Sequence, residues 1–113
     1  MKRIEAIIRE ERLEPVRKAL EDIGINSMTV TAVFGRGQQK GFSLRQPRVD
    51  RQKENFLPKI RLEVVCHDDD YKMVIEAVVN AARTGHIGDG KIFVSSVEEV
   101  IRIRTGGTGS DVL

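Results

Sequence analysis

Two copies of a strand–helix–strand pattern fill most of this chain of 113 residues. In the first copy, residues 3–8 alternate apolar and polar side chains, as a half-buried strand does. Apolar residues at helical spacing follow over 13–23, with Pro15 suited to the first turn and Gly24 to the stop. Residues 28–34 are rich in β-branched side chains and complete the first copy with a second strand.

The second copy begins with a predicted strand over 60–66. Asp68 is suited to cap a helix that Gly85 ends, and residues 92–97 form the next strand. At this length the chain forms one domain, residues 1–113, with a single small core. The two copies therefore predict an α+β fold, a ferredoxin-like βαββαβ sandwich in which two helices cover one sheet.

A long segment over 35–58 separates the two copies and has neither a helical nor a strand period. A loop of this length inside a compact domain is usually functional or disordered. Between Gly35 and Lys59 there are seven basic and two acidic residues, a net charge of +5, although the whole chain carries only +2. We expect this long loop to contact anions or a partner protein; a solvated insertion is the alternative.

A glycine-rich turn before the last strand nearly forms a phosphate-binding loop. Gly85, Gly90 and Lys91 fit the G-x-x-x-x-G-K spacing, but Ile92 stands where a hydroxyl residue should hold magnesium. A strand also follows the turn, whereas a phosphate-binding loop leads into a helix. The glycines still let backbone N–H groups approach a phosphate, with Lys91 adding charge. Asp89 either bonds a ribose or braces the turn.

Near the end of the chain, Arg102 and Arg104 alternate with two isoleucines. On a short strand this alternation directs both guanidinium groups to one side, where they can clamp an anion. A solvated strand face is the alternative interpretation.

Other classes of site fit the sequence poorly. Residues 35–41 miss the dinucleotide-binding fingerprint, because the third glycine comes one residue late and no helix follows. The two RNA-recognition signatures occur in reversed order and aromatic residues make up only 4% of the chain, so we expect no nucleic-acid binding. Cys66 is the single cysteine, and the acids after His67 suit a helix start better than a metal site. No motif indicates an activated nucleophile, so we expect no enzymatic activity and no catalytic residue.

The N-terminal residues are charged where a signal peptide needs an apolar core. No apolar run approaches the roughly 20 residues of a membrane span. We therefore expect a cytoplasmic protein without direct membrane insertion.

Several segments taken together resemble the PII signal-transduction proteins. The stretch TGHIGDGKIFV at 84–94 is similar to that family's signature, and IRIRTG at 101–106 is similar to its C-terminal loop. Shorter matches extend over nearly the whole remaining chain, at 2–9, 24–30, 39–41 and 56–59. The resemblance implies a homotrimer of ferredoxin-like subunits that binds ATP or ADP in clefts between neighbours.

The resemblance also assigns roles to segments and residues. It implies a long effector loop at 35–58, a nucleotide-binding turn at 84–91, and a C-terminal loop and tail at 101–113. The implied nucleotide contacts are Thr29, Gly35, Gly37, Gln38, Val65, Gly88, Asp89, Gly90, Lys91, Arg102 and Arg104. Of these, the two arginines belong to the neighbouring subunit's side of the phosphates. The implied 2-oxoglutarate contacts are Gln39, Lys40, Gly41 and Lys59. In the family, the residue matching Gln39 also coordinates Mg²⁺ together with ATP and 2-oxoglutarate.

In the family, the long loop changes shape with the bound ligand and inserts into target proteins, among them ammonium channels and enzymes of nitrogen metabolism. The resemblance therefore implies a regulator whose loop conformation is selected by ADP or by ATP with 2-oxoglutarate. A slow ATPase and an interaction trimer that does not sense 2-oxoglutarate are the alternatives.

Some features depart from typical members of the family. Tyr71, the only tyrosine, lies on a predicted helix, so control by uridylylation of a loop tyrosine is not expected. Ser43 is the one hydroxyl residue of the long loop, in surroundings unlike those of the phosphorylated serine of cyanobacterial members. Gln38 stands where an arginine is typical. Residues 35–37 are similar to the branch encoded with nitrogenase, which makes nitrogenase one candidate target.

Overall fold

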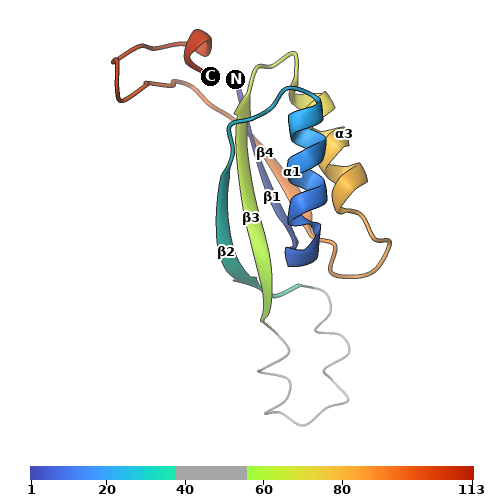
Figure 1. The fold of residues 1–113 in the computed structure, drawn as a ribbon. Coiled ribbons are helices and arrows are strands. Elements are labelled where there is room, and N and C mark those ends of the chain that lie inside the picture. The colour runs from blue at the N-terminus through green and yellow to red at the C-terminus, as the bar shows by residue number, and fades with distance from the viewer. Residues whose placement is uncertain (38–55) are drawn as a thin grey trace.

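The computed structural model describes residues 1–37 and 56–113. Within these residues, strands and helices follow one another in the order that the sequence predicts (Figure 1). The elements are β1 (Lys2–Arg9), the 3₁₀ turn η1 (Glu10–Arg12), α1 (Leu13–Asp22), β2 (Thr29–Gly35), β3 (Leu57–Cys66), α3 (Tyr71–Ala82), β4 (Lys91–Ser96) and the 3₁₀ turn η3 (Ser110–Val112).

The sheet has the strand order β2-β3-β1-β4, and its neighbouring strands are antiparallel. Helices α1 and α3 both lie on the same face of this sheet (Figure 1). This arrangement is the ferredoxin-like βαββαβ sandwich that two strand–helix–strand units predict. The predicted fold class of the single chain is therefore confirmed.

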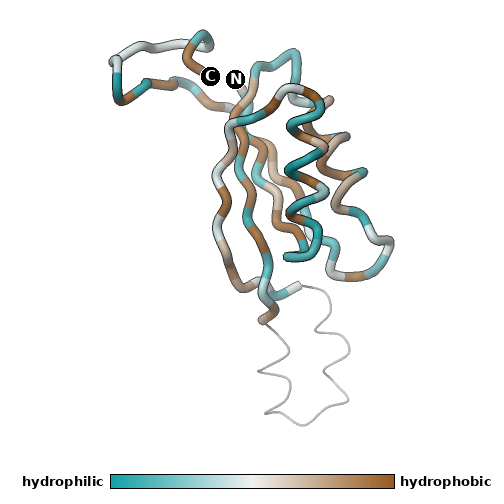
Figure 2. Tube along the Cα trace, in the orientation of Figure 1, coloured by the Kyte–Doolittle hydropathy of each residue, from teal (hydrophilic) through white to brown (hydrophobic). Residues whose placement is uncertain are grey.

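The core lies between the sheet and the two helices. Alternate residues of β1 point into it, so Ile4, Ala6 and Ile8 are buried while their neighbours stay partly accessible. Figure 2 shows hydrophobic positions recurring along the strands and both helices. No helix among the described residues is long and apolar enough to cross a membrane. The helices contribute buried residues four positions apart, which are Val16 and Leu20 on α1 and Val74, Val78 and Ala82 on α3.

The strand register brings segments that are distant in sequence to one end of the sheet. Arg9, the last residue of β1, pairs with Lys59 of β3, and Ile7 pairs with Lys91 at the start of β4. At the same end, Gly35 closes β2. We call this the loop end of the sheet, because the segment between β2 and β3 leaves and re-enters the sheet here.

Strands β2 and β3 reach into the segment predicted as a loop over 35–58. Gly35 still belongs to β2 and β3 begins at Leu57, so the ladder includes the pair of Phe34 with Pro58. The predicted loop boundaries are wrong, because cross-strand pairing rather than local period extends these strands through a glycine and a proline near a strand start.

The predicted cap of the second helix is also wrong. Helix α3 begins at Tyr71, and Asp70 at its N-cap position makes no side-chain cap hydrogen bond. A turn closed by the Asp70 N–H and the His67 carbonyl, 3.0 Å apart, precedes the helix. Asp68 instead lies 3.0 Å from the amine of Met1, and a hydrogen bond from this amine lowers the pKa of the Asp68 carboxyl group.

The C-terminal residues form an arm that leaves the sheet (Figure 1), so the short strand on which Arg102 and Arg104 could point to one side does not form. Only Ile101 pairs, in an isolated bridge with Thr108. The chain then turns, with the N–H of Gly106 donating to the Arg102 carbonyl at 2.8 Å. A strand needs a neighbouring strand to pair with, and here a glycine at φ +71° closes a turn instead.

Candidate functional site

A pocket of about 560 Å³ lies at the loop end of the sheet. It lies where β2 ends, β3 begins and the turn over 84–90 leads into β4. Seven residues predicted to contact ligands line this pocket. These are Gly35, Gly37, Lys59, Gly88, Asp89, Gly90 and Lys91. The structure thus brings residues assigned to nucleotide and to 2-oxoglutarate around one space.

The turn that leads into β4 has glycines at positions where the backbone is unfavourable for other residues. Gly88 has φ +107° and Gly90 has φ +102°, a conformation that side chains disfavour. A Cβ atom on Gly90 would also lie 1.6 Å from the carbonyl oxygen of Ile7. Gly90 therefore packs directly against the backbone of β1, which fixes the position of the turn relative to the sheet.

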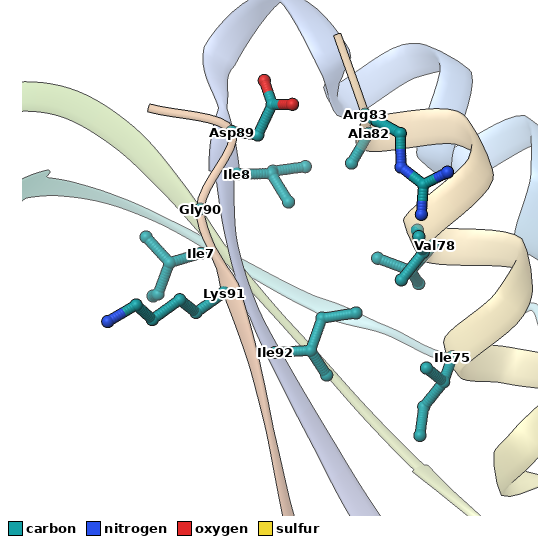
Figure 3. Close-up of a pocket in the computed structure, with 11 residues that line it drawn as sticks. Ile7, Ile8, Ile75, Val78, Ala82, Arg83, Asp89, Gly90, Lys91 and Ile92 are labelled. Atoms are coloured by element: carbon teal, nitrogen blue, oxygen red, sulfur yellow. The ribbon is translucent and has the colours of Figure 1, made fainter. Parts of the chain in front are cut away.

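Strand alternation then separates the side chains that follow the turn. Figure 3 shows Lys91 pointing away from α3, while Ile92 points toward Ile75 on that helix. A second pocket of about 270 Å³ lies on the helix side of the turn, between α3 and the edge of the sheet. The ammonium group of Lys91 therefore lies on the sheet face that the helices leave open.

Asp89 braces the turn from inside. Its carboxylate accepts hydrogen bonds from the backbone N–H groups of Thr84 and Gly85, at 2.8 and 2.9 Å, and from the Thr84 hydroxyl. It also forms an ion pair with Arg9, with Nε 3.0 Å from Oδ1. These donors, chiefly those of Thr84, lower the pKa of the Asp89 carboxyl group well below its usual range. The sequence leaves two roles open for Asp89, bonding a ribose or bracing the turn, and these hydrogen bonds brace the turn.

Two cations at neighbouring strand positions hold consecutive carbonyl groups of the turn. Arg9 Nη2 donates to the Ile87 carbonyl at 2.8 Å, and Lys59 Nζ donates to the Gly88 carbonyl at 2.6 Å. Lys59 is 7% exposed, and burial, followed by the nearby charge of Arg9, lowers its pKa. Sequence reasoning missed Arg9; its position as the last residue of a strand that ends beside the turn is the signal that could have indicated it.

The remaining described residues predicted to contact nucleotide lie elsewhere. Thr29 opens β2 and Val65 lies near the end of β3, so both are at the end of the sheet opposite the pocket. Arg102 and Arg104 lie on the C-terminal arm, which leaves from that same opposite end (Figure 1). Six residue steps along β2 separate Thr29 from Gly35, about 20 Å in an extended strand. Within the single chain, the structure does not bring these four residues close to the pocket at the loop end.

Four predicted ligand residues lie outside the described part of the chain, and Gln39, the predicted magnesium ligand, is one of them. Among residues 1–37 and 56–113, no group of three or more histidine, cysteine, aspartate or glutamate side chains could hold a metal ion. The four residues are Gln38, Gln39, Lys40 and Gly41.

We expect the turn to loosen in acid. Because the folded-state pKa of Asp89 is lowered, the stabilisation is present above the unfolded pKa of about 3.9. It is lost as the pH falls below that value toward the lower folded pKa. Amide resonances of Thr84 and Gly85, followed by NMR from pH 7 to pH 2, should stay in place through the usual titration range of a carboxyl group and move only toward the acid end, because the folded-state pKa is lowered. An Asp89→Asn variant provides the control, and the same acid-dependent movement in that variant would show that other groups cause it.

The fold and the pocket define a small ferredoxin-like protein with a cationic, glycine-lined pocket at one end of its sheet. The family model described as nitrogen regulatory protein P-II matches residues 1–107. The nitrogen regulatory protein P-II of Rhizobium meliloti (strain 1021) is 53% identical over 113 residues, which cover 100% of both chains. Nitrogen regulatory protein P-II 2 of Methanothermobacter thermautotrophicus is 51% identical and covers 96% of this chain and 94% of its own. The chain belongs to the nitrogen regulatory protein P-II family, whose similar members are named as regulatory proteins rather than enzymes.

Proposed function

We propose that this protein is a cytoplasmic sensor that binds ATP or ADP, and 2-oxoglutarate with Mg²⁺, in the clefts of a homotrimer. The single observation that supports this proposal best is the pocket at the loop end of the sheet. There, two lysines and the glycine turn lie beside the base of the long segment that is proposed to bind targets. A ligand in this pocket would therefore lie next to the segment whose shape it controls.

The pocket suits a polyphosphate for physical reasons. Glycines let the chain approach phosphate oxygens closely, and successive backbone N–H groups form an anion-binding concavity. Lys91 is exposed on the open face of the sheet and adds a positive charge beside this backbone. Arg102 and Arg104 are proposed to complete the phosphate contacts from a neighbouring subunit, because guanidinium groups match phosphate geometry.

Two residues are proposed to connect the nucleotide with 2-oxoglutarate. Gln39 would hold Mg²⁺, which supplies a bridging positive charge between two anionic ligands. Lys59 would pair with a carboxylate of 2-oxoglutarate, because its ammonium group has three donors and one already reaches Gly88. The regulated partners are proposed to be an ammonium channel, nitrogenase or another enzyme of nitrogen metabolism, contacted through the long loop.

Calorimetry of the wild-type protein with ADP, with MgATP, and with MgATP plus 2-oxoglutarate tests this function. We expect Lys59→Ala to weaken 2-oxoglutarate binding by about tenfold to a hundredfold, as a lost charge-assisted hydrogen bond does. Binding of ADP should fall less, since only the Gly88 contact of the turn is lost. The matched control is Lys18→Ala, because Lys18 is an exposed lysine of α1 that pairs with Asp22.

Absence of ATP binding by the wild-type protein would contradict the proposed function as a whole. Normal 2-oxoglutarate binding by Lys59→Ala would contradict the assigned carboxylate contact alone. Equal partner affinity with ADP and with MgATP plus 2-oxoglutarate would instead favour an interaction trimer without ligand sensing.

A further inference from the structure

Arg9 connects the end of one strand to the turn that opens another. It is the last residue of β1, and its guanidinium reaches across 80 residues of sequence to Asp89. Nε lies 3.0 Å from Asp89 Oδ1, while Nη2 lies 2.8 Å from the Ile87 carbonyl oxygen. The side chains of Arg9 and Asp89 are only 21% and 24% exposed, so solvent screens this pair less than a surface pair. One planar guanidinium therefore holds the turn at two points.

The contact with Asp89 extends to the other end of the turn. The same carboxylate receives the backbone N–H groups of Thr84 and Gly85, where the chain leaves α3. Arg9, Asp89 and Thr84 thus form a connected chain of polar contacts that closes the turn from its first residue to its sixth. Such a network limits the directions that the intervening peptide groups can take.

The carbonyl contacts determine which way the N–H groups of the turn point. Arg9 and Lys59 hold the carbonyls of Ile87 and Gly88, which are consecutive. In a trans peptide the N–H points opposite to the C=O of the same peptide unit. Holding these two carbonyls on the side of the cations therefore directs the N–H groups of Gly88 and Asp89 to the opposite side.

We propose that Arg9 is a positioning residue of the anion-binding turn: it fixes the direction of the turn's N–H groups without itself contacting the nucleotide. This inference rests on the proposed function, since it concerns how the same pocket presents donors to phosphate. Lys59 has one donor contact to the turn, whereas Arg9 has two, and one of these is with the carboxylate that braces the turn. The distinctive property of Arg9 is therefore its forked geometry as well as its charge.

The test compares Arg9→Lys, which keeps the charge and loses the fork, with Arg9→Gln, which loses both. We expect each variant to bind ATP at least about tenfold more weakly than the wild-type protein, because both lose the two-point contact. Amide resonances of Gly88 and Gly90 should shift in both variants. Arg17→Gln on α1 is the matched control, since Arg17 pairs only with Glu14 and Glu21 on its own helix among the described contacts.

A double-mutant cycle with Asp89→Asn separates positioning from a general effect on stability. If Arg9 acts through Asp89, the double variant of Arg9 and Asp89 should bind ATP no more weakly than whichever single variant has the lower ATP affinity. Wild-type ATP affinity in Arg9→Lys, or unshifted amide resonances of Gly88 and Gly90 in an Arg9 variant that binds ATP weakly, would overturn the inference. Additive losses in the double variant would contradict the route through Asp89 and favour the route through the Ile87 carbonyl. A wild-type protein that does not bind ATP would overturn the proposed function instead, so the two failures can be told apart.

Discussion

Replacing Gly90 with alanine is expected to lower the melting temperature by more than about 10 °C. The new Cβ atom would lie 1.6 Å from the carbonyl oxygen and 2.8 Å from the carbonyl carbon of Ile7. Ile7 belongs to β1, which pairs with β3 on one side and β4 on the other, so its backbone cannot move away without breaking the sheet. A positive φ of +102° adds strain for any side chain. A loss of about 3 kcal/mol or more corresponds to a shift of this size in a domain of about 100 residues.

Two alanine substitutions in the same region provide controls that can be measured by circular dichroism. Gly85→Ala has a similar φ of +90° but no atom within 4 Å of the new Cβ, so it tests backbone strain alone. Gly37→Ala has neither problem and should leave the melting temperature nearly unchanged. If Gly90→Ala melts at the same temperature as Gly85→Ala, the close packing of the turn on β1 is not the reason why residue 90 must be glycine.

The fold could be predicted from the sequence because its elements have clear local periods. The alternation over residues 3–8 reports a strand with one buried face, and the structure buries Ile4, Ala6 and Ile8 as this alternation requires. The order of two strand–helix–strand units then leaves few topologies, since each unit places its strands parallel with space for one strand between them. The periodicity of each strand and helix therefore agrees with the topology of the whole sheet.

The local sequence pattern leaves the structure open, or predicts it wrongly, where the pattern has more than one structural solution. The alternating residues around Arg102 look the same on a strand and in a turn, and only a neighbouring strand decides between them. Asp68 has the right type for a helix cap, but it lies beside the N-terminal amine, a contact across 67 residues. Neither outcome can be read from the residues nearby.

The candidate site divides in the same way. The glycine turn is visible in the sequence because its spacing is local, and the structure gives a steric reason for Gly90. The roles of Arg9 and Asp89 depend on the register that places Ile7 opposite Lys91, which no spacing reveals. Contacts between segments that are distant in sequence can therefore be identified only in the structure, because the residues that make them belong to no recognisable sequence motif.

The position of the arginine pair leads to the second large expected effect. Lys91 lies at the loop end of the sheet, and Arg102 and Arg104 lie on the arm that leaves the opposite end. In the proposed trimer, each cleft would take the turn from one subunit and the arm from its neighbour. Lys91→Ala subunits alone, and Arg102→Ala/Arg104→Ala subunits alone, should therefore both lose tight ATP binding in every cleft. Mixed trimers of the two should recover it.

The recovery has a definite stoichiometry, because a mixed ring always contains one place where an intact turn meets an intact arm. Trimers that carry both variants, purified through two different tags, should bind one ATP per trimer with wild-type affinity in calorimetry. Trimers built from two differently tagged Lys91→Ala subunits are the control and should bind none tightly, since no subunit then supplies an intact turn. If mixed trimers show no tight site while the wild-type protein binds ATP, the turn and the arm do not form a shared cleft. The separation of these residues in the fold would then reflect two unrelated sites rather than two halves of one.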